Sequence, residues 1–198
     1  IGNIENDGTI IGYFDNNGSS INQLIDHGCL DTNNRTVPCY HGSAIINIGT
    51  IDSIKNYQKG NIIGSGIYGA TAIWNKNGYI NSVINSGKIL ANSDLGNSIE
   101  LIQPKPNFGI YSQCLCLPTH QYNMMPEKGI YKIENSGEII ASNIGIGNEN
   151  GIYSLINTGY ITSALGIANF GYMYDLQNSG LIRSTLELLP DFSAGIAN

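Results

Sequence analysis

Residues 133–139, Ile-Glu-Asn-Ser-Gly-Glu-Ile, contain a pattern that the chain repeats along its length. The pattern is an aliphatic residue, Asn, Gly and a second aliphatic residue, each separated by one residue. Internal repetition every few tens of residues is typical of solenoid proteins, in which each repeat packs on its neighbours. The repeats therefore predict the architecture. Other clean copies are residues 45–51, 83–89, 155–161 and 176–182, with further copies at 4–10 and at 24–30, where Asp26 replaces Asn.

The spacing of these copies matches one coil of a parallel β-helix. Gly137 and Gly159 are 22 residues apart, and Gly159 and Gly180 are 21 residues apart, as are Gly28 and Gly49. Short apolar runs of period two, separated by turn residues, predict strands, and Gly and β-branched residues at this density disfavour helical repeats. We therefore expect an all-β fold, a parallel β-helix (β-solenoid) with coils of about 20–22 residues.

Both ends of the chain lie within the repeating pattern. The last four residues, Gly-Ile-Ala-Asn at 195–198, match residues 166–169, which precede the copy at 176–182. At the other end, Ile1 and Gly2 lead almost directly into the first copy. We expect residues 1–198 to be a single solenoid segment of a longer array.

Each residue type within a copy has a structural role. The two aliphatic residues end one core-facing strand and begin the next, while Asn and Gly form the bend because both tolerate left-handed backbone angles. Asn side chains at equivalent bends on successive coils, about 4.8 Å apart, can link amide to amide as a ladder. We expect this structural role for Asn47, Asn135, Asn157 and Asn178.

A second phrase, Gly-Ile-Tyr, precedes several copies and ends at Tyr68, Tyr111, Tyr131 and Tyr153. If Ile faces the core, the alternation of a strand places Tyr outside, so these tyrosines are binding candidates. We expect the last two to stack on neighbouring coils, with Tyr172 or Tyr174 continuing the strip. The strip serves lateral strand packing, or it forms a sugar-binding or self-association face, because tyrosine combines broad contact area with a polar tip.

Two stretches interrupt the repeats, at about residues 29–42 and 91–128. Insertions leave a solenoid as loops, and loops on a rigid scaffold commonly carry function. Further binding candidates are therefore Arg35 in the first loop and His120 and Tyr122 in the second.

The same two stretches contain all four cysteines, Cys29, Cys39, Cys114 and Cys116. In an extracellular chain, a disulfide between the first two would close the first loop. The second two are too close for an easy mutual disulfide, and the connectivity stays open. A mirrored His-x-Cys and Cys-x-His set offers zinc as an alternative to the first disulfide: His27, Cys29, Cys39 and His41.

The composition argues against several functions. The net charge of −6 and the pI near 4.8 disfavour nucleic acid as a partner, because such binding rests on Lys and Arg. No apolar run approaches the roughly 20 residues that cross a membrane. Three histidines without a Gly-x-Ser-x-Gly motif, together with scattered carboxylates, predict a protein that is not an enzyme and uses no cofactor.

The Asn-Ser-Gly and Asn-Thr-Gly bends between Ile-rich strands resemble those in passenger domains of bacterial autotransporters and in filamentous-haemagglutinin-like adhesins. The resemblance is one of repeat style and covers nearly the whole chain outside the two insertions. It implies a right-handed β-helix at the cell surface or in the medium, with a role in adhesion or cell aggregation. The partner would be a glycan or protein on another cell, or a further copy of the chain. Passengers of this class usually have few cysteines, and this chain departs from that pattern.

Two other functions stay open. The chain would serve as a structural subunit of an extracellular filament, sheath or surface layer if the open ends of the β-helix joined, since such ends normally need caps. A polysaccharide-active β-helix enzyme is the third, and it would need carboxylates gathered on adjacent coils.

Overall fold

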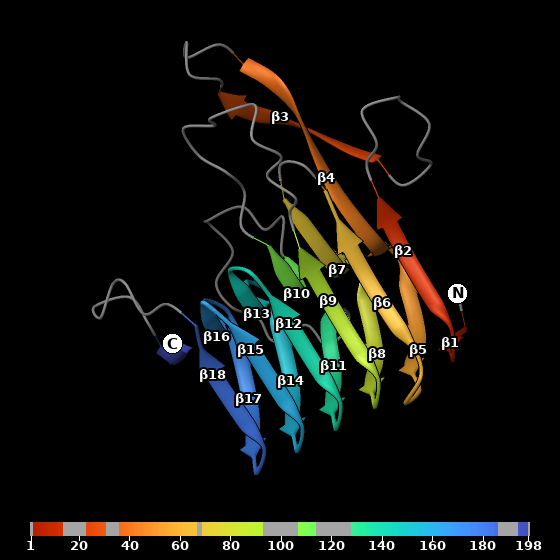
Figure 1. Cartoon of the computed structure of the whole chain (residues 1–198), viewed down its shortest axis with the longest axis vertical. Helices are drawn as coiled ribbons and strands as arrows, with labels where there is room; N and C mark the ends of the chain where they lie inside the picture. The colour runs from red at the N-terminus through yellow and green to blue at the C-terminus, as the bar shows by residue number, and fades with distance from the viewer. Residues whose placement is uncertain are drawn as a thin grey trace.

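The computed structural model of the chain is a column of stacked coils built from strands (Figure 1). Six coils each contribute one strand to each of three sheets, here named A, B and C. The structure describes residues 2–13, 23–30, 36–66, 69–92, 107–113, 128–185 and 194–197, with the backbone alone for residues 13, 23–30, 36–41 and 194. Over these residues the chain forms no helix, and the predicted all-β parallel solenoid is confirmed.

The strands of successive coils pair in parallel within each sheet. Sheet A consists of β1 (Asn3–Asn6), β5 (Thr50–Asn56), β8 (Tyr79–Asn85), β11 (Gly129–Asn135), β14 (Gly151–Asn157) and β17 (Tyr172–Asn178). Sheet B consists of β2 (Thr9–Tyr13), β6 (Asn61–Ser65), β9 (Lys88–Asn92), β12 (Glu138–Ala141), β15 (Tyr160–Ser163) and β18 (Leu181–Ser184). Sheet C consists of β4 (Thr36–Asn47), β7 (Ala70–Lys76), β10 (Phe108–Gln113), β13 (Ile144–Asn148), β16 (Leu165–Asn169) and β19 (Ala194–Ala197), with β3 (Gln23–Leu30) beside β4.

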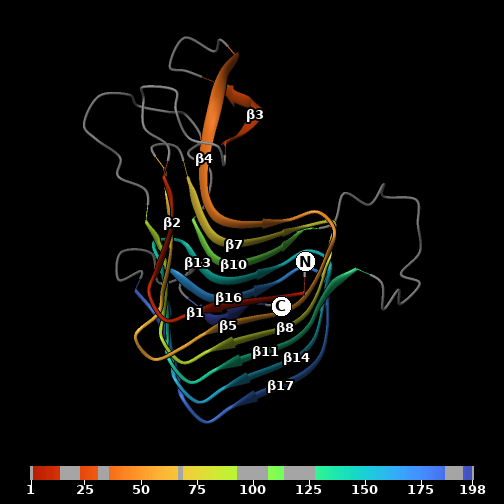
Figure 2. The ribbon, with the colours of Figure 1, turned by 90° about the vertical axis from the view of Figure 1, so that its right-hand side faces the viewer.

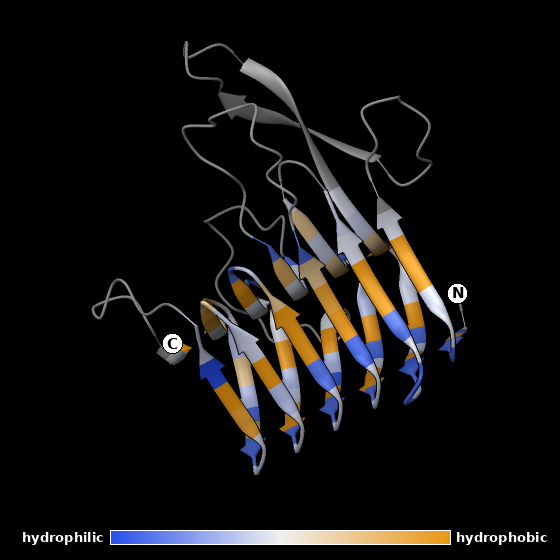
Figure 3. Ribbon diagram, in the orientation of Figure 1, coloured by the Kyte–Doolittle hydropathy of each residue, from blue (hydrophilic) through white to orange (hydrophobic). Residues whose placement is uncertain are grey.

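The core is a set of aliphatic columns that run up the inside of the coils. The apolar bands recur at the same height on successive strands (Figure 3). Burying one such side chain stabilises the fold by roughly 1.5–3 kcal/mol, and strict register places like residues in contact. One column in sheet B is formed by Ile10, Ile62, Ile89, Ile139, Ile161 and Ile182.

The coils differ in length although the register of the sheets is kept. Equivalent Asn residues at the corner between sheets A and B are separated by 50, 29, 50, 22 and 21 residues from the first coil to the last. The predicted coil of 20–22 residues is therefore correct for the last two steps alone. Most of the extra residues enter between sheets B and C and, in one coil, between β10 and β11, while two more enter between β5 and β6. The loop predicted at about 91–128 is therefore wrong in part, because β10 lies within it as a strand of sheet C.

The copy predicted at residues 24–30 is wrong. These residues lie in β3, which pairs antiparallel with β4 in a hairpin that projects beyond the coils (Figures 1 and 2). Asp26 pairs with Cys39 instead of forming a corner, because the neighbouring strand of the hairpin provides hydrogen-bond partners for the backbone of this segment. The first insertion is thus a hairpin, and β4 joins the parallel sheet where Gly42 pairs with Ala70.

The predicted amide ladder exists, and it extends over all six coils. At the corner between sheets A and B, each Asn donates from Nδ2 to Oδ1 of the Asn on the next coil, over 2.7–2.8 Å. Every donor is buried, and every acceptor except the exposed Asn178 is buried too, so the ladder satisfies the corners internally. Its members are Asn6, Asn56, Asn85, Asn135, Asn157 and Asn178.

Asn47 does not belong to this ladder, contrary to the prediction. It lies at the corner between sheets C and A and donates to Asn75 over 2.8 Å. Asn148 and Asn169 form the same bond three coils later, over 2.7 Å. The same sequence pattern occurs at both corners, and the sequence alone does not distinguish them.

The predicted reason for the corner glycines is also wrong. Among the described residues, positive φ angles occur at Asn77, Gly69 and Gly129, none of which is a glycine of the Asn-x-Gly corners. The corner glycines are needed because coils stack closely. A Cβ atom added to Gly137 would overlap the carbonyl oxygen of Gly87 on the coil before.

Candidate functional site

Three tyrosines form a continuous stack on the outer face of sheet A. Tyr131, Tyr153 and Tyr174 occupy equivalent positions on three successive coils, and we name them the tyrosine ladder. Neighbouring ring centroids are 4.9 Å apart, with interplanar angles of 9° and 5°. The predicted stacking of Tyr131 on Tyr153 is confirmed, and Tyr174 continues it.

The geometry decides which part of each ring meets solvent. Two rings lying edge to edge in one plane would clash at this centroid distance, so the rings overlap face to face. Their inner faces therefore cover one another, and the side chains of Tyr131 and Tyr153 are still 45% and 44% exposed. The exposed parts are the ring edges and hydroxyl groups. Tyr174, at the end of the ladder, is 65% exposed.

Tyr172 widens the surface at one end of the ladder. Its ring lies 6.4 Å from that of Tyr174 with an interplanar angle of 40°. At the other end the same column of positions continues as Asn81 on β8, whose Oδ1 accepts a hydrogen bond of 3.3 Å from the hydroxyl of Tyr79. Burial raises the pKa of Tyr79, and Tyr131 adds to the shift. The ladder thus runs between a polar end and an aromatic end.

The charges beside the ladder are paired locally. Lys132 forms an ion pair with Glu134 on the same strand. Gln177 donates from Nε2 to Oδ2 of Asp175 over 2.8 Å. Exposed ion pairs of this kind contribute little to stability. The charge of Lys132 is thus balanced by Glu134, whereas Asp175 has a neutral partner and keeps its negative charge.

Tyr111, the other predicted surface tyrosine that the structure describes, is not exposed. It lies on the outer face of sheet C in β10, 8% exposed, and stacks on Phe108 with centroids 4.0 Å apart. Trp74 stacks on it at 6.2 Å and holds Lys76 Nζ over its ring at 5.1 Å. The phrase Gly-Ile-Tyr recurs on two sheets, and in sheet C the tyrosine joins a buried aromatic cluster.

This cluster also has polar partners. Trp74 Nε1 donates to Gln113 Oε1 over 3.1 Å. Burial and a hydrogen bond to Glu149 hold the pKa of Tyr111 well above its usual range. Gly147 makes room for the rings, since a Cβ atom there would approach Phe108 and Tyr111. The cluster is a second, outer apolar core and offers no open surface for a ligand.

Several predicted site residues lie outside the described part of the chain. These are Arg35, Tyr68, Cys114, Cys116, His120 and Tyr122. The backbone of the β3–β4 hairpin is described, and in it Cys29 pairs with Val37 and Asp26 with Cys39. The side chains of His27, Cys29, Cys39 and His41 are not described, so the disulfide and zinc predictions stay predictions. Elsewhere in the described chain, no three His, Cys, Asp or Glu residues gather to hold a metal.

Sequence reasoning missed the aromatic partners Trp74 and Phe108 and most members of the amide ladders. A signal for the ladders is present: Asn56 and Asn75 are each followed by Gly within four residues, as at the recognised corners. The longer gap between Asn and Gly at these two corners means that a strict Asn-x-Gly pattern does not find Asn56 and Asn75.

Comparison with known protein families, with curated proteins and with solved structures gives no match. In the described residues no helix is long and apolar enough to span a membrane.

Proposed function

We propose that the chain is a non-catalytic, extracellular β-solenoid that mediates adhesion or cell aggregation, and that the tyrosine ladder is its contact surface. One observation carries the proposal: three stacked tyrosines stand exposed on a flat sheet face. Tyrosine is enriched at protein contact surfaces, and large exposed apolar groups in a row commonly mark interaction sites.

The rigidity of the scaffold supports this use. Each ladder tyrosine follows a core residue, which is a buried Ile at positions 130 and 152 and a partly buried Met at position 173. The rings are therefore held at fixed spacing before any partner arrives. Such preorganisation lowers the entropy cost of binding, because few rotamers remain to be lost.

We extend the proposal to the handedness of the column and its cellular location. Figure 2 looks along the column from the N-terminal end, and there the chain passes from β1 through β2 to β4 in a clockwise course as it recedes. This course, and the strong right-handed preference of parallel crossovers, supports a right-handed winding. The repeat style that resembles surface-exposed passenger domains supports a location on the cell surface or in the medium.

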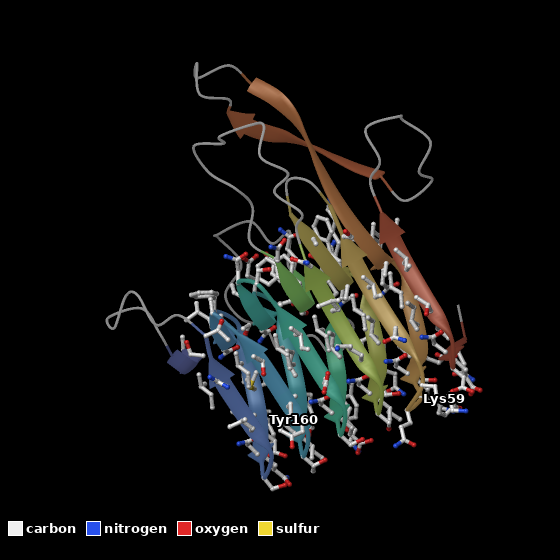
Figure 4. The ribbon with its side chains drawn as sticks, in the orientation of Figure 1. Lys59 and Tyr160 are labelled. Atoms are coloured by element: carbon white, nitrogen blue, oxygen red, sulfur yellow. The ribbon has the colours of Figure 1, made fainter. Side chains whose placement is uncertain are left out.

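The test is an adhesion assay with the intact chain on beads. We expect wild-type beads to clump or to bind a cell layer, and beads with Tyr131, Tyr153 and Tyr174 all changed to Ser to lose most of that binding. The matched control is Tyr160→Ser, since Tyr160 is 56% exposed at the start of β15 in sheet B, away from the ladder (Figure 4). Full adhesion by the triple variant would refute the ladder as the contact surface.

A second candidate function is a structural filament subunit, and the polarity of the amide ladder supports it. Every bond runs from a donor on one coil to an acceptor on the next, so over the described coils Asn6 Oδ1 and Asn178 Nδ2 stand at opposite ends. A further coil, or a second copy, could extend this ladder and the sheets in the same direction. Electron microscopy of purified chain tests it: ordered fibres support the filament, and single columns at all concentrations contradict it.

A further inference from the structure

The tyrosine ladder has a period, and a periodic partner would use it best. Its rings repeat every 4.9 Å along the column, which is the spacing between paired strands. Each coil offers one phenol edge in the same orientation. A ligand whose units advance by a similar length would place one unit at each tyrosine, and linked contacts of this kind raise the overall affinity strongly.

Resting on the proposed function, we propose that the ladder binds a neutral, extended, β-1,4-linked polysaccharide that lies along the column axis. In such a polymer each sugar advances by a length close to one coil step, and the chain is straight. Successive sugars would therefore meet Tyr131, Tyr153 and Tyr174 in turn. An α-1,4-linked glucan coils away from a straight row and would contact one or two tyrosines only.

The exposed chemistry of the rings fits hydroxyl-rich ligands. A phenol hydroxyl both donates and accepts hydrogen bonds, as sugar hydroxyls do. The ring faces between Tyr131, Tyr153 and Tyr174 are covered, so sugars contact the ring edges along the ladder. The open face of Tyr174, beside the tilted ring of Tyr172, gives one place where a sugar ring can stack.

Charge favours a neutral polymer over an acidic one or a second copy. The chain carries a net charge of −6, so acidic polysaccharides and other copies are repelled at low salt. Beside the ladder, Lys132 is neutralised by Glu134, and Asp175 leaves the surface slightly acidic. A basic patch that would hold an acidic polymer is absent from the described face around the ladder.

Calorimetry with defined oligosaccharides and the whole chain tests the proposal. The probes are cellohexaose and mannohexaose as β-1,4-linked oligomers, cellobiose as a short one, maltohexaose as an α-1,4-linked control and polymannuronate as an acidic β-1,4-linked one. We expect affinity for the β-1,4-linked hexamers to exceed that for cellobiose and maltohexaose by about tenfold or more, because only they span three tyrosines.

Variants separate the ladder from the rest of the surface. Tyr153→Ala interrupts the row at its centre and should weaken binding of the hexamers by about tenfold or more, whereas Tyr160→Ala should leave it unchanged. Tyr153→Phe keeps the stack and removes one hydroxyl, and it should give an intermediate loss. Circular dichroism checks that each variant keeps its strands.

The outcomes distinguish this inference from the proposed function. Absence of binding to the β-1,4-linked hexamers, equal affinity for maltohexaose, or preferred binding of polymannuronate overturns the proposal of a neutral β-1,4-linked polysaccharide. Concentration-dependent self-association that Tyr153→Ala abolishes, without hexamer binding, also overturns it and identifies a second copy as the partner. In each of these cases the bead assay still decides whether the ladder is adhesive.

Discussion

Gly159 lies directly over the carbonyl group of Gly137 on the preceding coil, with no room for a Cβ atom between them. The same carbonyl oxygen accepts a hydrogen bond of 2.9 Å from the backbone of Tyr160. Glycine at this corner is thus required by the distance between coils, and its backbone angles are ones that any residue adopts. The relationship repeats between Gly180 and Gly159.

Gly159→Ala should destabilise the column. The added methyl would push against a hydrogen-bonded carbonyl, and overpacking of this kind costs about 1–3 kcal/mol. Gly8→Ala is the matched control, because Gly8 lies at the same corner of the first described coil and has open space around the position of a Cβ. Urea unfolding measures both variants, and equal midpoints would contradict the stacking argument.

Asn135→Ala should cost about 2–4 kcal/mol. Asn135 accepts a bond of 2.8 Å from Asn85 and donates one of 2.7 Å to Asn157. Both partners are buried, and each bond left unmade there costs roughly 1–3 kcal/mol. Asn178→Ala removes one ladder bond at an exposed position and should cost clearly less. Thermal unfolding followed by circular dichroism compares the two, and similar losses would argue against a cooperative ladder.

Ser112→Asn should stabilise the fold. Ser112 occupies the position between Asn75 and Asn148 in the second ladder, is fully buried, and its Oγ has no hydrogen-bond partner. An amide there can join the two halves, and a typical hydrogen bond contributes about 1 kcal/mol. Ser112→Ala, which only removes the unpaired hydroxyl, is the control. The melting temperature of Ser112→Asn should be the highest, followed by that of Ser112→Ala and then that of the wild type. A lower melting temperature for Ser112→Asn than for Ser112→Ala would refute the idea that an amide at position 112 completes the ladder.

The stability of the chain should fall at alkaline pH through Tyr111. Its pKa is raised in the folded state by burial and by Glu149, so the folded chain favours the protonated phenol. That contribution is complete below the ordinary tyrosine pKa of about 10 and is lost progressively as pH rises above it. Tyr111→Phe should show a weaker loss between pH 9 and roughly pH 11 in urea unfolding. An unchanged pH profile would exclude Tyr111 as the responsible group.

Much of the architecture follows from local sequence. Copies such as residues 133–139 place their two isoleucines in the core and their Asn in a ladder, as period-two alternation and corner chemistry predict. The stacking of Tyr131 on Tyr153 follows from the same register.

The remaining features depend on contacts that lie outside the local phrase. Tyr111 and Tyr131 have the same local phrase, and only neighbours such as Phe108 and Trp74 decide that the first is covered. Residues 24–30 fit the repeat, yet pairing with β4 makes them a hairpin strand. The reason for the corner glycines could not be predicted either, because it depends on the adjacent coil, which the local sequence does not contain.

The unequal coil lengths have a consequence for how such a column can change. Long and short segments join β9 to β10 and β15 to β16, yet Ala141 still pairs with Ala91, and Ile146 still pairs with Ile110 and Ile167. The junction between sheets B and C therefore tolerates inserted segments of different length, while the amide ladders keep the coils in register. A foreign peptide grafted there would be displayed at the surface without altering the column that carries it.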